Sequence, residues 1–235
     1  MAVAVQELLV QDVRNFLDRI GKEPALQQGV TALLSAARAA PQPRRMTYEE
    51  FLDWADEDTL AEWENGEVIM ASPASYRHQD IASFLTSVLR IYVEQNHLGV
   101  LCPAPFQMKL EHSGREPDLL FVTTAHQNRL KATYLDGPAD LAVEIISLES
   151  AERDRGKKFL EYETAGVAEF WLVDPLRRWL ECYQLGEEER YNTAFAGREN
   201  VYRASVLPGF WLRAEWLWQI PLPPVLDVLR TLEVI

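Results

Sequence analysis

The sequence lacks several features that would place it quickly in a class of protein. No apolar run reaches the roughly 18 residues that a helix needs to cross a bilayer, so we expect no transmembrane helix. Its two cysteines, Cys102 and Cys182, are too few for a disulfide framework or a zinc site, which indicates a reducing, cytoplasmic setting. The first residues lack the basic segment that opens a secretory signal, so none is expected.

Positive charge is also scarce. The 23 Lys and Arg residues face 36 Asp and Glu residues, and the net charge is −13. This balance argues against a protein that coats nucleic acid by general electrostatic attraction, although a local basic groove stays open. The imbalance is greatest over residues 46–76, which hold nine acidic residues and no Lys or Arg. A solvated helix face is the simplest interpretation of that segment.

The chain is long enough for one sizeable core with an appendage, at 235 residues and 48% hydrophobic composition. Apolar residues recur at helical spacing from Leu8 to Ile20, and the segment PQPRR (41–45) is typical of a linker. We therefore predict an N-terminal helical appendage over residues 1–44 and a main domain over residues 45–235. Whether the appendage covers a site, pairs two chains as a homodimer or simply packs is left open.

Helix and strand signals alternate in the main domain. Thr47 followed by Glu50 predicts a capping box that opens a helix, and Asn65-Gly66 predicts a tight turn before a strand. A long helix is expected over 77–97, with apolar residues along one face. Later, strands at 141–146 and 169–175 flank a charged helix at 152–166, an order that usually joins two parallel strands. The fold class expected is α/β.

The strand DLAVEIIS (140–147) contains an acid where an apolar side chain is expected. A carboxylate in a buried strand is costly unless something pairs with it or is coordinated by it. Strand alternation puts Glu144 on one face with Ala142 and Ile146, away from the odd-numbered residues 141–145. Glu144 is therefore the first candidate for a functional residue.

A second carboxylate, Asp118, opens the apolar strand DLLFV (118–122) after Pro117. If the strands of Asp118 and Glu144 are neighbours, their carboxylates converge and repel each other unless they share a cation. Mg²⁺ prefers oxygen ligands and often takes one or two carboxylates plus substrate phosphate. The pair therefore suggests a divalent metal site. In the alternative interpretation Glu144 points outward at a sheet edge and Asp118 caps a turn, and spacing alone does not decide.

A lysine beside such a site would help to orient water or to stabilise negative charge. Lys158 follows the Glu144 strand on the predicted helix and shares a helix face with Tyr162, four residues later. Its long side chain could extend past the packed aromatic ring toward the strand end. The alternative is an ordinary surface lysine in a charged helix.

Four segments resemble a known family when taken in order. These are EWENGEVIMASPASYRHQDI (62–81), EPDLLFV (116–122), DLAVEIIS (140–147) and DRGKKFLEYETAGVAEFWLVDP (154–175). They are similar to the Uma2 family, also called DUF820, of the PD-(D/E)XK restriction-endonuclease-like superfamily. The resemblance covers roughly residues 46–185 and implies a restriction-endonuclease-like core, with a mixed central β-sheet flanked by helices.

The resemblance also implies roles for individual residues. Asp118 would be the metal-binding Asp of the PD motif, and Glu144 would be the second acidic ligand. Glu62 resembles the acid that the first helical region contributes in such folds, and could complete the metal shell. The usual motif has lysine where this chain has Ile146, and Lys158 matches the position to which the family displaces it. The implied cofactor is Mg²⁺ or Mn²⁺, and the implied substrate is DNA.

The sequence also departs from the family pattern. Residues 147–150 read SLES where the family often has S-P-S-T, which adds a negative charge where a phosphate would pass. His78 and Gln107 lie in family-like segments, but their residue types alone give them no role.

Three functions are consistent with these observations. The leading hypothesis is a Mg²⁺-dependent endonuclease, and the main objection to it is the net charge of −13. In the second, the nuclease fold serves with little catalysis as a binding or regulatory module for protein partners. In the third, the same site hydrolyses small phosphate compounds.

Overall fold

The computed structural model describes residues 45–56, 59–70, 72–147, 150–151 and 153–235. The predicted appendage at 1–44 lies outside these residues, and the domain division stays a prediction. Within the described part, no helix is both long enough and apolar enough to cross a membrane. Both cysteines are free thiols. The cytoplasmic setting inferred from them stays a prediction.

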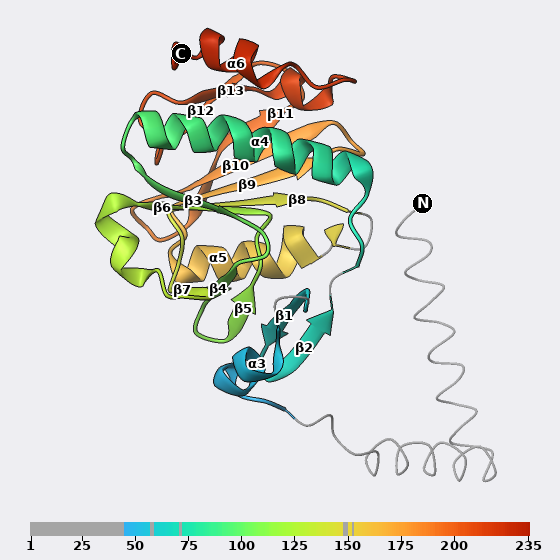
Figure 1. Cartoon of the computed structure of the whole chain (residues 1–235), viewed down its shortest axis with the longest axis vertical. Coiled ribbons are helices and arrows are strands. Elements are labelled where there is room, and N and C mark those ends of the chain that lie inside the picture. Colours follow the sequence, from blue (N-terminus) through green and yellow to red (C-terminus); the bar gives the residue numbers. More distant parts are fainter. Residues whose placement is uncertain (1–44, 57–58, 71, 148–149, 152) are drawn as a thin grey trace, which may run out of the picture. The chain divides into compact units, whose positions relative to one another are not determined.

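A six-stranded mixed sheet forms the centre of the main domain (Figure 1). Its strand order is β11-β10-β9-β8-β6-β3, and all neighbours are antiparallel except β8 and β9, which are parallel. The crossover predicted between residues 140 and 175 is therefore confirmed. The strands are β3 (Gly99–Pro103), β6 (Leu119–Thr123), β8 (Leu141–Ile145), β9 (Glu169–Asp174), β10 (Trp179–Leu185) and β11 (Tyr191–Gly197).

A second sheet of five strands has the order β2-β1-β5-β4-β7. Its first hairpin turns at Asn65 and Gly66, whose φ angles of 48° and 92° lie in the left-handed region that such a turn requires. The predicted turn is thus confirmed, but the sequence did not indicate a separate sheet. Its strands are β1 (Ala61–Glu64), β2 (Glu67–Met70), β4 (Gln107–Lys109), β5 (Ser113–Arg115) and β7 (Tyr134–Asp136), and β12 (Val201–Arg203) pairs with β13 (Trp211–Arg213) elsewhere.

The helices begin close to where the sequence predicts. Thr47 and Glu50 form a reciprocal capping box at the start of α3, as expected. The long helix α4 is capped by Ser75, and the charged segment ends at Gly166 with a left-handed φ of 86°. The α-helices are α3 (Tyr48–Trp54), α4 (Tyr76–Gln95), α5 (Phe159–Ala165) and α6 (Val225–Thr231), with 3₁₀ turns at Thr124–Arg129 and Ala214–Trp218 and a π-helical segment at Arg153–Lys158.

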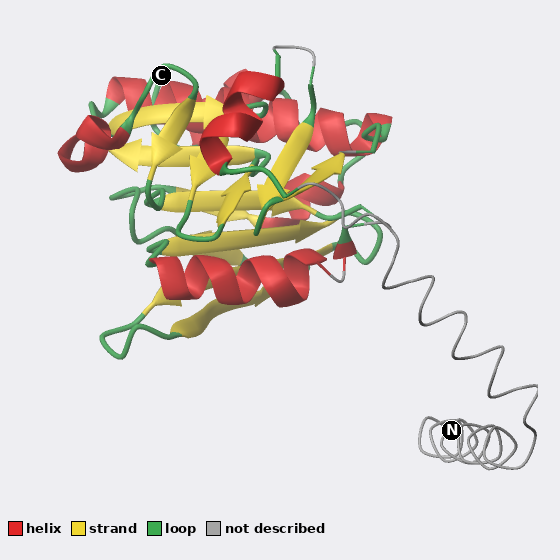
Figure 2. Ribbon diagram, turned by 90° about the horizontal axis from the view of Figure 1, so that it is seen from below, coloured by secondary structure: helices red, strands yellow, loops and turns green. Residues whose placement is uncertain are grey.

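Strand β8 separates two apolar clusters on opposite faces of the six-stranded sheet. Leu141, Val143 and Ile145 pack with the buried face of α4, whereas Ala142 and Ile146 belong to a second cluster. That second cluster includes Tyr162 of α5 and the apolar residues of β4 and β7. The layers can be followed in Figures 1 and 2. The alternation predicted for β8 is correct, so Glu144 lies on the α5 side.

Candidate active site

The two predicted carboxylates come from neighbouring antiparallel strands. The register of β6 and β8 pairs Leu119 with Val143 and Leu120 with Ala142. Extending this register by one residue places Asp118 opposite Glu144, where side chains of an antiparallel pair share a face. Glu144 is only 4% exposed and lies on a strand with neighbours on both sides. The alternative in which it points outward at a sheet edge is therefore wrong.

Asp118 is held by two donors. Its Oδ2 accepts a hydrogen bond of 2.6 Å from the backbone N–H of Ile145, and its Oδ1 lies 3.2 Å from Nε2 of His78. His78 comes from the first turn of α4, and its Nδ1 is buried without a hydrogen-bond partner among the described residues. Burial lowers the pKa of His78, but the nearby Asp118 outweighs it and the pKa is raised. His78, which had no assigned role, thus orients Asp118.

Glu144 is oriented by a lysine and a tyrosine from the following helical segment. The Nζ of Lys158 donates to both carboxylate oxygens at 2.9 Å, and the Tyr162 hydroxyl donates to Oε1 at 2.7 Å. The predicted reach of Lys158 toward the Glu144 strand is therefore present in the structure. Burial raises the pKa of Glu144 above its usual range, and the Lys158 ammonium opposes this shift.

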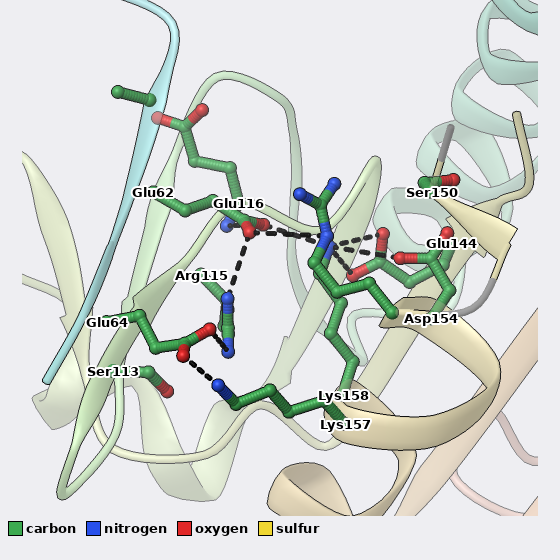
Figure 3. Close-up of polar contacts among 12 residues, drawn as sticks. Glu62, Glu64, Ser113, Arg115, Glu116, Glu144, Ser150, Asp154, Lys157 and Lys158 are labelled. Atoms are coloured by element: carbon green, nitrogen blue, oxygen red, sulfur yellow. Dashed lines mark hydrogen bonds and ion pairs between the residues drawn. The ribbon is translucent and has the colours of Figure 1, made fainter. Parts of the chain in front are cut away.

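Lys158 is the centre of a wider cluster of acids. Its Nζ also lies 2.9 Å from Oε1 of Glu62 and 3.6 Å from Oδ1 of Asp154 (Figure 3). Burial alone would lower the pKa of Lys158, but Glu144, Glu62 and Asp154 together raise it above its usual value. Lys158 is 2% exposed, so it is a buried cation and not a surface lysine.

The segment that carries Lys158 is π-helical from Arg153 to Lys158 and then continues as α5. A π-helical turn holds one more residue than an α-helical turn, and such turns are frequent at functional sites. Asp154 faces Lys158 from the same segment and is 1% exposed, and its Oδ1 accepts no hydrogen bond within the described part of the chain. Burial raises its pKa. Nothing in the sequence pattern distinguishes Asp154 from the other charged residues of this segment.

Glu62 lies on strand β1 and not on a helix, and its role in completing the metal shell stays a prediction. A turn and a second sheet, not a helix, bring it to Lys158. Its Oε1 also accepts from the backbone N–H of Glu116 at 3.2 Å, and its Oε2 accepts from Arg115 at 3.1 Å. Arg115 has no exposed surface and was missed, because an arginine in a short strand gives no sign in the sequence of the partners that bury it.

Gln107 and Glu116 form a polar contact beside Glu62. Gln107 Nε2 donates to Oε1 of Glu116 and to the carbonyl of Ala61, both at 2.8 Å. Burial raises the pKa of Glu116 to about 7, and the charge of Glu62 adds to the shift while Gln107 opposes it. The Gln107 side chain therefore links Ala61, the first residue of β1, to the carboxyl group of Glu116.

The donors of this site suit a hard cation, although no ready-made set of ligands is present. Among the residues described, no group of three or more His, Cys, Asp or Glu is arranged to hold a metal ion. The carboxylates of Glu62, Glu144 and Asp154 instead converge on the single ammonium of Lys158. Together with Asp118 on the neighbouring strand, these are all oxygen donors, and one buried oxygen of Asp154 accepts no hydrogen bond from any described residue. Oxygen donors with excess negative charge are what Mg²⁺ prefers, so the chemistry of the donor set fits.

Comparisons with known proteins agree with this architecture. A family model named Uma2, described as "Putative restriction endonuclease", matches residues 48–215. A solved structure described as "a putative nuclease belonging to DUF820", from Anabaena variabilis, superposes with a TM-score of 0.64 at 18% sequence identity. The match covers 74% of this chain and 97% of that one, and it confirms the fold class. None of the curated proteins matches the sequence.

Proposed function

The chain belongs to the Uma2 family of restriction-endonuclease-like proteins, and from this we propose that it is a Mg²⁺-dependent endonuclease that hydrolyses phosphodiester bonds of DNA. The description of this family as restriction endonucleases supports nuclease activity for this chain. One observation carries the residue assignment: Lys158 Nζ lies 2.9 Å from both oxygens of Glu144, on the strand beside Asp118. An acid pair with an adjacent lysine is suited to phosphodiester hydrolysis.

Asp118 and Glu144 would hold the Mg²⁺ or Mn²⁺ ion, and Glu62 would complete its protein ligands. When bound, the ion supplies a Lewis acid for the scissile phosphate and lowers the pKa of a water molecule. The chain's own contribution is to fix these acids. The Ile145 N–H and His78 hold Asp118, and the hydroxyl of Tyr162 holds Glu144.

Lys158 acts in this proposal as a fixed positive charge. Because its neighbouring carboxylates raise its pKa, the ammonium stays protonated at neutral pH and is unsuited to act as a base. A positive charge next to the cleavage site stabilises the negative charge that develops on the phosphate. The same ammonium keeps the carboxylates of Glu62 and Glu144 close together.

The strongly acidic surface limits how DNA would bind. Phosphate contacts by Lys and Arg dominate the affinity of DNA-binding proteins. The two most exposed bases on the segment that carries Lys158 are Lys157, with 50% of its side chain exposed, and Arg153, with 33%. They support local contacts to a backbone at the site, and we expect cleavage to weaken steeply with added salt.

The experiment that tests the function is cleavage of supercoiled plasmid and single-stranded DNA by the full chain, with Mg²⁺, with Mn²⁺ and with EDTA. We expect metal-dependent cleavage that is lost in Glu144→Ala and Lys158→Ala. The control is Glu188→Ala, which removes an exposed acid from the turn after β10 and should keep full activity. A wild-type protein that leaves every nucleic acid intact in Mn²⁺ would contradict the proposal.

Two other outcomes would point to the alternative functions. Cleavage of a generic phosphodiester, bis(p-nitrophenyl) phosphate, without cleavage of DNA would favour hydrolysis of small phosphate compounds. Failure to bind Mn²⁺ at all in calorimetry would favour a nuclease fold that serves as a binding or regulatory module.

A further inference from the structure

Arg115 is a fully buried arginine at the end of strand β5. A guanidinium group stays charged at any ordinary pH, so burying it is costly unless every donor finds an acceptor. Three carboxylates surround it, from Glu62, Glu64 and Glu161. These carboxylates compensate the charge of the buried guanidinium.

The contacts of Arg115 join two elements that carry site residues. Its Nε and Nη2 donate to the two oxygens of Glu161, on α5, at 2.8 and 2.7 Å. Its Nη1 donates to Oε2 of Glu62 at 3.1 Å and its Nη2 donates to Oε2 of Glu64 at 2.7 Å, both on β1 (Figure 3). Arg115 thus ties the strand of Glu62 to the helix that follows Lys158.

The two oxygens of Glu62 have separate partners as a result. Oε2 faces Arg115, and Oε1 faces Lys158 and the backbone N–H of Glu116. We propose that Arg115 is a positioning residue of the site, which turns Glu62 so that one oxygen is presented to Lys158 and the metal position. Arg115 acts through Glu62 and touches no reacting atom.

The geometry needs an arginine. A guanidinium is a planar fork with five donors, which can hold one carboxylate in a bidentate contact and reach two more. A lysine is a point charge with three donors, so it cannot reproduce the four hydrogen bonds that Arg115 makes to Glu161, Glu62 and Glu64. Arg115→Lys therefore keeps the buried charge while removing the orientation, which separates the two effects.

The inference rests on the proposed function, because the orientation of Glu62 affects metal affinity only if Glu62 is a ligand of the metal ion. The first measurement is the Kd for Mn²⁺ of the full chain, by calorimetry. Loss of a residue that orients a metal ligand typically weakens metal affinity about 10- to 100-fold, and we expect at least about tenfold in Arg115→Lys. The matched control is Arg190→Lys, whose arginine pairs with Glu163 on α5 outside the Lys158 cluster, and its Kd should be unchanged.

A double-mutant comparison tests whether Arg115 acts through Glu62. In a Glu62→Gln background, Arg115→Lys should cause no further loss of Mn²⁺ affinity, because the ligand that it orients is already gone. An equal loss in both backgrounds, or a Kd for Arg115→Lys within about twofold of wild type, would overturn the inference. Thermal unfolding of each variant confirms that a folded protein is being measured.

A crystal structure of metal-free Arg115→Lys keeps the inference testable without metal or activity. The Glu62 Oε1 to Lys158 Nζ distance, now 2.9 Å, should exceed about 3.5 Å. If the distance is kept, Arg115 is not needed to position Glu62, whatever the protein binds. If the distance grows but wild type binds no Mn²⁺, the proposed function fails and the positioning role stands. If Arg115→Lys does not fold, Glu161→Gln replaces it, because this change weakens the hold on the guanidinium from its partly exposed side. The same distance and the same Mn²⁺ affinity are then measured and interpreted in the same way.

Discussion

Lys158 donates hydrogen bonds of 2.9 Å to both carboxylate oxygens of Glu144, although 14 positions separate the two residues along the chain. The usual superfamily motif would place the lysine on the strand itself, two residues after the acid. Here that position is Ile146, which packs in the apolar cluster under α5. The ammonium therefore comes from a different element and reaches the same acid from the side of the helix.

Replacing Lys158 with methionine should abolish most of the activity. The change removes the only ammonium on which Glu62, Glu144 and Asp154 converge within the described residues. Loss of one fixed electrostatic group typically lowers kcat about 100-fold or more. Lys131 is exposed and its Nζ donates to the carbonyl of Asn128, away from the acids of the site, so Lys131→Met should change kcat less than about threefold. Plasmid-nicking rates of the two variants provide the measurement, and equal losses would show that Lys158 has no special role.

Removing the Tyr162 hydroxyl should weaken the site without disturbing the core. Tyr162→Phe deletes the 2.7 Å hydrogen bond to Glu144 and keeps the ring packed against Phe170. We expect about a tenfold loss in Mn²⁺ affinity or kcat, as for other residues that orient a ligand. Tyr191→Phe is the matched control, because its hydroxyl donates to the Val167 carbonyl at 2.8 Å away from Glu144. Calorimetry on both proteins should show a change for Tyr162→Phe alone.

Glu169 is a buried carboxylate outside the Lys158 cluster, and replacing it should lower stability without lowering activity. Glu169 has no exposed surface and accepts five hydrogen bonds, from Trp171, Tyr202, Ser205 and Val206. The amide of Glu169→Gln would set donors against these donors, so the free energy of unfolding should fall by about 1–3 kcal/mol. Urea denaturation measures this. Cleavage per folded molecule should stay at the wild-type rate, and a selective loss of activity would show that Glu169 belongs to the site.

The raised pKa of Glu116 predicts a pH-dependent contribution to stability. The folded protein keeps the Glu116 proton up to about pH 7, whereas the unfolded chain loses it near the ordinary pKa of 4.5. Between these values the folded state binds more protons, so the free energy of unfolding falls as the pH rises. Glu116→Gln has no such proton to lose. Comparing urea denaturation at pH 5 and pH 8, the decrease should be smaller in Glu116→Gln by up to about 2 kcal/mol. An identical decrease in both proteins would show that Glu116 does not titrate in this range.

The features that the sequence predicts correctly are local ones, which depend on residues close together in the chain. The Thr47–Glu50 cap, the Asn65-Gly66 turn and the alternation of β8 depend on contacts within a few positions, and all three are present. The crossover from β8 to β9 also follows from local order, because a strand, a helix and a strand in sequence usually join two parallel strands of one sheet.

Contacts between distant segments are what the sequence could not predict. Glu62 and Arg115 are 53 positions apart, and only the second sheet brings them together. Asp154 reaches Lys158 through a π-helical turn, whose extra residue leaves no periodic signal in so short a segment. A buried polar cluster of this kind is fixed by tertiary packing, so it appears only when the strands are placed.

The two faces of β8 also determine where this chain and its relatives can gain or lose residues without losing the site. Because side chains alternate with a period of two, inserting or deleting one residue within β8 would turn Glu144 into the apolar cluster under α4 and expose Val143 to the acids. The turn from Gly186 to Arg190 between β10 and β11, where residues 187–190 are exposed, is the kind of connection that carries no such constraint. Natural variation in length should therefore accumulate in that connection, while the strand itself tolerates exchange of residues but not their addition or loss.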